Sequence, residues 1–222
     1  EPGLRVPFVV YDPYVKVRGV RSQSIINHTD IVPSVLDFAG ELDHSKQRPK
    51  HWMPPEEYWQ EKPYATHENH GPRNGLLAYH GRSWLPILTD PDVEIHDAHF
   101  ASHTFHEIQM YYPMRAVSDH EWKLIWNIAH PLPYPFASDL WAASSWQSQY
   151  QRSLDAPYGN KTVKEYIYRP RFELYHIKED PEETTNLAND PDHARTLFKY
   201  QEKLKEMQQK FRDPWITKWN YE

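Results

Sequence analysis

The chain has 222 residues, enough to bury roughly 70% of the surface that its unfolded form would expose, which suits one large domain or two small ones. Its net charge of -6 argues against nucleic-acid binding, which needs clustered Lys and Arg, and no apolar run reaches the about 20 residues of a membrane span. The chain has no Cys, which excludes disulfides, thiolate metal sites and thiol nucleophiles.

Aromatic residues make up 14% of the chain, and its 20 Pro outnumber its 7 Gly. Aromatic loops that are fixed by proline often line carbohydrate-binding clefts, because ring faces stack on the apolar faces of sugars. Large rings also simply fill cores under long loops. The composition leaves both interpretations open.

The sequence pattern of residues 1–45 predicts one strand and one helix. Residues 6–10 (Val-Pro-Phe-Val-Val) are a continuous apolar run, closed by Tyr11-Asp12-Pro13, which suits a buried strand. Asp30 is the predicted N-cap of a helix and Gly40 its predicted end. The apolar positions of this helix are Ile31, Val32, Val35, Leu36 and Ala39. A single strand cannot form a parallel sheet, so we expect its partner strands elsewhere or in an N-terminal part that is missing.

Residues 46–97 show little periodicity, and we interpret them as an insertion with connecting loops. A short helix opened by proline is expected at residues 54–59. The run His67-Glu68-Asn69-His70 has a superficial likeness to a zinc site, but neighbouring Pro-Arg and Asn-Gly pairs argue against the helix that would bring both imidazoles to one face. We therefore assign no metal site.

Residues 98–222 predict a subdomain with an antiparallel sheet and a terminal helix. Residues 100–107 alternate as a strand does, and residues 115–118 and 122–128 indicate two strands joined in a hairpin. Another strand is expected to end at Tyr175. Ser138 and Asp139 are predicted to cap a helix over residues 140–151. The last helix is expected from about residue 192 to 211, with the apolar stripe Ala194, Leu197, Leu204, Met207 and Phe211.

The stretch from Ser102 to Arg115 is the densest run of imidazole, carboxylate, guanidinium and aromatic groups in the chain. If it is a strand, one of its faces could form the wall of a binding site. Alternatives remain for each residue: Glu107 could be the buried partner of Arg115, and His106 an ordinary polar residue of a sheet. For Arg115 we favour a structural role over contact with a substrate.

Six short segments occur in the order in which the C-terminal portion of the sulfatases, in the alkaline-phosphatase-like superfamily, carries similar ones. They are Gly3-Leu4-Arg5-Val6-Pro7-Phe8, Thr29-Asp30-Ile31-Val32-Pro33-Ser34-Val35-Leu36-Asp37, Gly81-Arg82-Ser83-Trp84-Leu85-Pro86, Trp122-Lys123-Leu124-Ile125, Glu173-Leu174-Tyr175, and the tail signature Asp180-Pro181-Glu182-Glu183 with Asn186-Leu187-Ala188. The chain thus resembles that portion over nearly its whole length.

A finer resemblance points to the heparan N-sulfatase branch of the family. It is carried by His106-Glu107, Tyr112-Pro113-Met114-Arg115, Pro133-Tyr134-Pro135, Arg169-Pro170-Arg171-Phe172-Glu173-Leu174-Tyr175 and Asp213-Pro214-Trp215. His103 and Phe105 depart from that branch, which has Gln and His there. These departures bear on sulfamate specificity.

The resemblance implies an α/β fold. Residues 1–45 would be the last strand and helix of the sulfatase catalytic domain, residues 46–97 an insertion, and residues 98–222 a small antiparallel sheet packed by a C-terminal helix. The implied function is hydrolysis of sulfate ester or sulfamate groups on a glycosaminoglycan-like carbohydrate. In this portion the resemblance implies substrate recognition, for which the candidate residues are His106, Glu107 and His103.

The catalytic groups of the family are expected outside this chain. Its nucleophile is a formylglycine made from a Cys/Ser-X-Pro-X-Arg motif, which this sequence lacks, and its calcium ion is held by residues expected upstream. We therefore assign no catalytic residue here and expect the chain alone to be inactive. The expected partners are a sulfated carbohydrate and the N-terminal catalytic part of the same protein, with no nucleic acid and no membrane. The family resemblance favours a periplasmic, secreted or lysosomal location.

Two other functions remain open. A non-catalytic carbohydrate-binding module is favoured by the Trp and Tyr content. A phosphoesterase of the same superfamily would be favoured by zinc bound through His67, His70 or His106.

Overall fold

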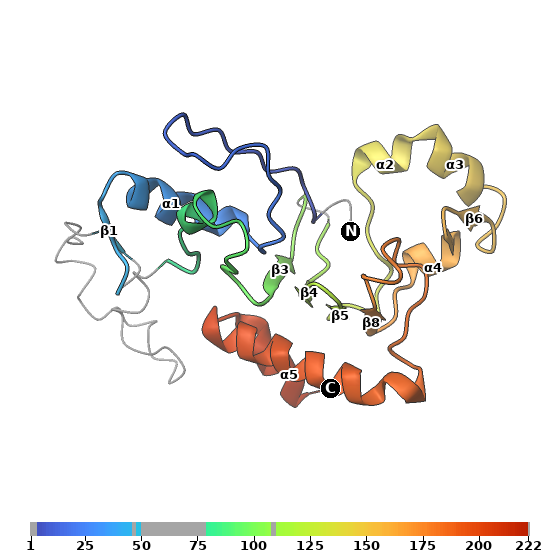
Figure 1. Ribbon diagram of the computed structural model, residues 1–222. Coiled ribbons are helices and arrows are strands. Elements are labelled where there is room, and N and C mark those ends of the chain that lie inside the picture. The colour runs from blue at the N-terminus through green and yellow to red at the C-terminus, as the bar shows by residue number, and fades with distance from the viewer. Residues whose placement is uncertain (1–3, 46–47, 50–78, 108–109, 222) are drawn as a thin grey trace, which may run out of the picture. The chain divides into compact units, whose positions relative to one another are not determined.

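The computed structural model describes residues 4–45, 48–49, 79–107 and 110–221 (Figure 1). The chain forms two compact units, of which the N-terminal unit is Phe8–His99. The C-terminal unit combines Glu1–Pro7 with Phe100–Glu222. The helix expected at residues 54–59, and the run from His67 to His70, lie outside the described residues.

The N-terminal unit contains a short helix and two minimal strands. Its elements are the 3-10 turn η1 (His28–Asp30), helix α1 (Ile31–Phe38), strands β1 (Leu42–Asp43) and β2 (Arg48–Pro49), which pair antiparallel, and the 3-10 turn η4 (Leu85–Leu88). The predicted helix after Asp30 is confirmed. Gly40 follows it with φ of 75°, a left-handed conformation that glycine adopts without steric cost.

The side chain of Asp30 does not cap α1, so that part of the prediction is wrong. Its fully buried carboxylate instead accepts hydrogen bonds from the backbone N–H groups of Asn27 and Arg82, both at 2.8 Å, and lies 2.9 Å from Nε2 of His96. A buried carboxylate is stable only when such partners replace its water. Asp30 therefore joins three segments of the N-terminal unit.

Residues 81–84 dock onto the start of α1. A Cβ on Gly81 would lie 2.2 Å from the carbonyl oxygen of Thr29, so only glycine allows this approach. The hydroxyl of Ser34 donates to the carbonyl of Asp30 at 2.6 Å and accepts from the N–H of Trp84 at 3.0 Å. In this structure the Gly-Arg-Ser-Trp segment thus has a packing role.

Two apolar segments of the first 45 residues are exposed, contrary to prediction. Residues 6–10 form no strand, and no described strand pairs with them, although a strand needs a neighbour for its hydrogen bonds. Val9 is 90% exposed. The apolar stripe of α1 also lies largely at the surface, with Val35 60% exposed, because the helix buries Pro33 and Ser34 instead.

A four-stranded sheet forms the centre of the C-terminal unit, in the order β3-β4-β5-β8. Its strands are β3 (His99–His103), β4 (Met114–Ser118), β5 (Lys123–Asn127) and β8 (Phe172–Tyr175). β4 pairs antiparallel with β5, and β5 with β8, which confirms the predicted hairpin and the strand ending at Tyr175. The first strand is shorter than predicted, because it stops at His103.

Helix α5 (Ala194–Lys210) follows the 3-10 turn η5 (Pro191–His193) and packs on β4 and β5 (Figure 1). Leu204 is fully buried, as are Val117 of β4 and Leu124 of β5. Burial of a leucine side chain contributes about 1.5–3 kcal/mol. The predicted fold of an antiparallel sheet packed by a C-terminal helix is confirmed.

The β4–β5 turn is tied to α5 through Asp119. One oxygen of its carboxylate accepts from the N–H groups of Glu121 and Trp122, each at 3.0 Å, and the other accepts from the hydroxyl of Tyr200 and from Nζ of Lys203. Burial raises the pKa of Asp119, but these hydrogen bonds outweigh it and hold the pKa below its usual value. One residue therefore shapes the turn and anchors the helix.

A second core lies between β5 and β8 in the sequence. It contains helices α2 (Ser138–Ala142), α3 (Ser144–Tyr150) and α4 (Val163–Ile167) and strands β6 (Pro157–Tyr158) and β7 (Lys161–Thr162). The single helix predicted over residues 140–151 is broken at Ala143, where ψ is 129°. In an unbroken helix Trp141 and Trp146 would point about 140° apart. The break lets both rings pack on Phe136: the centroid of its ring lies 5.6 Å from that of Trp141 and 4.6 Å from that of Trp146.

Candidate functional site

The loop between β3 and β4 carries two of the predicted substrate-binding residues. It closes where the N–H of Tyr112 donates to the carbonyl of Thr104 at 3.0 Å. His106 and Glu107 lie in a bend of this loop, beyond the end of β3. The strand alternation expected for them is therefore wrong. They belong to a loop, the usual place for binding residues on a rigid scaffold.

Arg115 holds the base of this loop. Its Nε and Nη2 donate to the two carboxylate oxygens of Asp213 at 2.6 and 2.9 Å, and its Nη1 donates to the carbonyl of His103 at 2.9 Å. The Arg115 and Asp213 side chains are each only 5% exposed. The structural role favoured for Arg115 is confirmed, and its acidic partner is Asp213 rather than Glu107.

Asp213 also fixes the segment that follows α5. Its carboxylate accepts from Nε2 of Gln208 at 2.8 Å and from the N–H of Trp215 at 3.2 Å, which caps the 3-10 helix η6 (Pro214–Asn220). Burial raises the pKa of Asp213, but the hydrogen bonds from Arg115 and Gln208 outweigh it, so the pKa lies below its ordinary value. The pair is ionised at neutral pH and joins the loop to the end of the chain.

The three predicted residues occupy different surroundings. His103 is half-buried in β3, where its Nδ1 donates to the carbonyl of Tyr112 at 3.0 Å and so orients the ring. His106 is exposed. Glu107 is half-buried, and its Oε1 accepts from the hydroxyl of Ser138, at the start of α2, at 3.3 Å. The bend thus presents an imidazole and a carboxylate next to each other in the chain, with Glu107 supported from α2.

Sequence reasoning missed a row of aromatic side chains next to these residues. Phe105 and Tyr111 of the loop have ring centroids 5.2 Å apart, and Tyr111 lies 6.2 Å from Trp215 of η6. We call Phe105, Tyr111 and Trp215 the aromatic row. Its first two members were visible as aromatic residues flanking His106 and Glu107, but no local pattern could place Trp215 beside them, about a hundred residues away.

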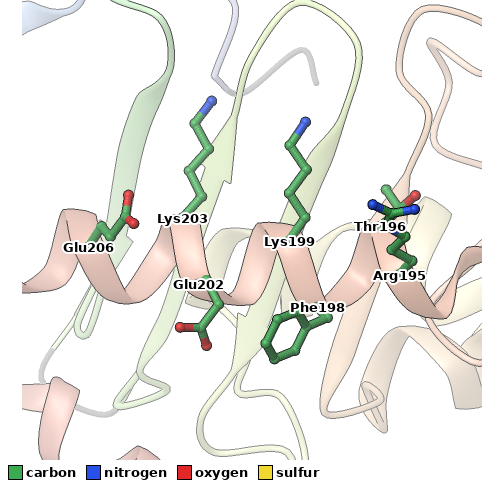
Figure 2. A pocket seen from close by; sticks show the side chains of 7 residues that line it. All are labelled: Arg195, Thr196, Phe198, Lys199, Glu202, Lys203 and Glu206. Atoms are coloured by element: carbon green, nitrogen blue, oxygen red, sulfur yellow. The ribbon is translucent and has the colours of Figure 1, made fainter.

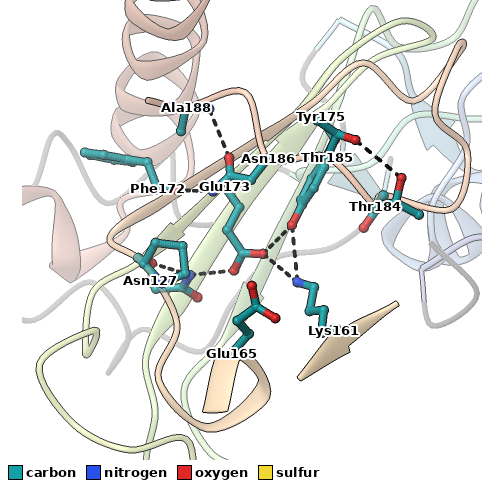
Figure 3. A network of polar contacts seen from close by, with 12 residues as sticks. Asn127, Lys161, Glu165, Phe172, Glu173, Tyr175, Thr184, Thr185, Asn186 and Ala188 are labelled. Carbon is teal, nitrogen blue, oxygen red and sulfur yellow. Dashed lines mark hydrogen bonds and ion pairs between the residues drawn. The ribbon is translucent and has the colours of Figure 1, made fainter. Parts of the chain in front are cut away.

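A buried polar network lies on β8 (Figure 3). Glu173 accepts from the hydroxyl of Tyr175 at 2.6 Å, from Nδ2 of Asn127 at 2.7 Å and from Nζ of Lys161 at 3.2 Å. Burial raises the pKa of Glu173, yet the charge of Lys161 and these hydrogen bonds more than compensate and lower it. Burial and the nearby Glu173 carboxylate raise the pKa of Tyr175. A deprotonated carboxylate in contact with a protonated phenol joins β5, β7 and β8, which is a structural task.

A shallow hollow of about 610 Å³ runs along α5 (Figure 2). Lys199 and Lys203 point to one side of the helix, while Phe198 and Glu202 point to the other. Lys203 pairs with Asp119 at 3.3 Å and Glu202 with Lys205 at 2.7 Å, so these two charges are balanced within the fold. All the lining residues belong to one helix. We therefore place the candidate site at the β3–β4 loop.

Within residues 4–45, 48–49, 79–107 and 110–221, His, Asp and Glu form no group of three or more that could hold a metal ion. Among the described helices, none combines the length and the apolar character needed to cross a membrane.

Comparison with known proteins identifies relatives over almost the whole chain. Human N-sulphoglucosamine sulphohydrolase is 31% identical over 219 residues, which cover 97% of this chain and 38% of that protein. This chain matches the C-terminal portion of sulfatases. An ulvan-active sulfatase of Formosa agariphila is 26% identical over 197 residues, covering 86% of this sulfatase-like chain and 30% of the relative. The chain thus spans well under half the length of these curated relatives.

The chain is also similar to solved structures, at lower identity. One is a protein in complex with its substrate D-glucosamine-2-N,6-O-disulfate, with a TM-score of 0.43 and 16% identity, covering 83% of the sulfatase-like chain and 24% of that protein. Another is a 2-O glycosaminoglycan sulfatase, with a TM-score of 0.45 and 17% identity. The match covers 85% of the sulfatase-like chain and 26% of that protein. No protein-family model matches the sulfatase-like chain. The predicted resemblance to sulfatases, including the heparan N-sulfatase branch, is confirmed by the match to the human protein.

Proposed function

We propose that this chain is the substrate-recognition portion of an enzyme that hydrolyses sulfate ester or sulfamate groups on a glycosaminoglycan-like carbohydrate. The observation that carries the proposal is the match to a sulphohydrolase over 97% of the chain. The names of the relatives include N-sulphoglucosamine and, for a sulfatase, ulvan, which supports a sulfated sugar as the substrate class.

In this proposal the bend of the β3–β4 loop contacts the sugar. Glu107 accepts a hydrogen bond from a sugar hydroxyl, because an ionised carboxylate offers only acceptors. His106 donates a hydrogen bond from a ring N–H to a hydroxyl or to a sulfate oxygen. His103 supports the loop beside them. Each role is favoured by the exposure of His106, by the contact of Glu107 with Ser138 and by the fixed ring of His103.

Formylglycine and calcium do not fit the residues of this chain. The chain contains no Cys and no Ser-X-Pro-X-Arg run, and its described residues form no acidic cluster for a cation. When bound, these groups would supply the oxygen nucleophile and neutralise the sulfuryl oxygens. We assign both to a part of the full-length protein outside these residues, and we derive no catalytic step from this chain.

The proposed catalytic part also gives the exposed apolar residues of the N-terminal unit a partner. Val9, Val35 of the α1 stripe and Phe38 of the same helix are exposed in the described chain. Exposed apolar side chains that form one patch often mark an interaction site. We propose that the N-terminal catalytic part of the same protein packs against it.

The test is made in the full-length protein, with sulfate release from an N-sulfated or O-sulfated glucosamine as the readout. We expect His106→Ala and Glu107→Gln each to raise KM about tenfold or more, since a hydrogen bond to a charged group contributes about 1.5–3 kcal/mol. kcat and the melting temperature should change little. The matched control is Glu179→Gln, whose carboxylate is 80% exposed and pairs only with the neighbouring turn at His176.

Three results would argue against the proposal. Binding of an unsulfated glycan without any sulfate release by the wild-type protein would favour the carbohydrate-binding module. Release of phosphate from a phosphorylated sugar, with no release of sulfate, would favour the phosphoesterase. Unchanged KM in both loop variants would remove His106 and Glu107 from the recognition site.

A further inference from the structure

The aromatic row lies at the surface of the C-terminal unit. Phe105 is 62% exposed and Tyr111 is 42% exposed, and Trp215 is partly buried. Adjacent rings are inclined by 51° and 45° rather than stacked flat. Aromatic rings are stabilised by removal from water, so a connected row of exposed rings often marks an interaction site.

A buried ion pair fixes the two segments that carry the aromatic row. Arg115 binds the carbonyl of His103 on the loop side and the carboxylate of Asp213 on the side of η6. Asp213 in turn accepts the N–H of Trp215. The two segments that supply the rings are thus joined by a buried ion pair, and the surface that the rings offer is pre-organised, which reduces the entropy lost on binding.

Two polar residues adjoin the aromatic row in the chain. His106 and Glu107 follow Phe105 in the chain, and Glu107 is oriented by Ser138. A ligand that covers the rings therefore meets two polar side chains as well as aromatic faces. A pyranose ring suits both parts, because its C–H face can stack on an aromatic ring while its rim of hydroxyls reaches the carboxylate and the imidazole.

We propose that Phe105, Tyr111 and Trp215 form a stacking platform for a pyranose ring of a sulfated oligosaccharide. The platform rests on the proposed function, in which His106 and Glu107 recognise the sugar, and it adds aromatic contact to that recognition. Most of the affinity contributed by the platform comes from Phe105 and Tyr111, the more exposed rings.

The experiment measures binding of a heparin-derived tetrasaccharide to the full-length protein by titration calorimetry, with sulfate release assayed separately. We expect Phe105→Ala and Tyr111→Ala each to weaken binding about tenfold, the factor that corresponds to loss of one well-packed ring contact. Phe105→Trp should stay within about twofold of wild type, because it keeps a ring face. The matched control is Phe198→Ala on α5, a phenylalanine that is 63% exposed and outside the row.

The outcomes separate the platform from the proposed function. If wild type releases sulfate but the alanine variants at 105 and 111 bind like the Phe198 control, the platform is wrong and the function stands. If no sulfate is released but these two variants still weaken binding, the platform stands without the function. A wild-type protein that neither binds nor hydrolyses the sugar overturns both. A lower melting temperature with unchanged affinity would show that protein covers the rings, which also overturns the platform.

Discussion

Replacement of Asp213 by alanine should be the most informative test of the structure. The carboxylate accepts four hydrogen bonds, two from Arg115 and one each from Gln208 and the N–H of Trp215. Asp213→Ala leaves a guanidinium 5% exposed and without its counter-ion. Breaking a buried pair from one side costs about 3–5 kcal/mol, because the remaining charge stays desolvated. We therefore expect the free energy of unfolding to fall by about that amount.

The assay is urea unfolding followed by Trp fluorescence, at pH 7 and at acid pH. The pKa of Asp213 is lower in the folded than in the unfolded chain, so its contribution is complete above the unfolded pKa of about 3.9 and disappears as pH falls through the folded value. The difference in unfolding free energy between wild type and Asp213→Ala should therefore become smaller below about pH 4. Glu179→Ala, at an exposed carboxylate, should change stability by less than about 0.5 kcal/mol. A loss below about 1 kcal/mol for Asp213→Ala at pH 7 would refute the argument that the ion pair anchors the loop.

Three further changes test the packing. Gly81→Ala places a Cβ 2.2 Å from the carbonyl oxygen of Thr29 and should destabilise the N-terminal unit by about 1–3 kcal/mol. The loss should appear as a lower melting temperature, and an unchanged melting temperature would contradict the close approach. Leu204→Ala should cost about 2–5 kcal/mol in urea unfolding, since the side chain is fully buried, and a cost below 1 kcal/mol would argue against the packing of α5. Glu173→Gln should cost about 1–3 kcal/mol at pH 7, because it removes a charged acceptor from a buried network. The cost should shrink as pH falls below the unfolded pKa of about 4.3 and through the lower folded pKa of Glu173; a cost that stays constant over this range would exclude ionised Glu173.

The local patterns of the C-terminal unit predicted much of its structure. The hairpin of β4 and β5 follows from two alternating runs around Asp119, and α5 follows from an apolar stripe at helical spacing. Both depend on neighbours in the chain, which a sequence shows directly. The same holds for α1, which ends where Gly40 reverses the backbone.

Long-range contacts account for most of what was missed. The strand at residues 6–10 was predicted from apolarity, but a strand also needs a partner, and no described strand supplies one. The helix predicted over residues 140–151 breaks because two Trp rings share Phe136, a packing choice that propensity cannot express. At the site, the pairing of Arg115 with Asp213 spans 98 positions, so Glu107 was the nearer but wrong partner.

The 98 positions between Arg115 and Asp213 also set the order of events during synthesis. The β3–β4 loop is synthesised long before Asp213 and Trp215, so the loop lacks the ion pair that anchors it until residues 213–215 have been added. Trp219 of η6 also packs on the sheet, because its ring centroid lies 4.0 Å from that of Trp126 in β5. A truncation that removes Asp213 and Trp215 would therefore release the loop that carries His106 and Glu107.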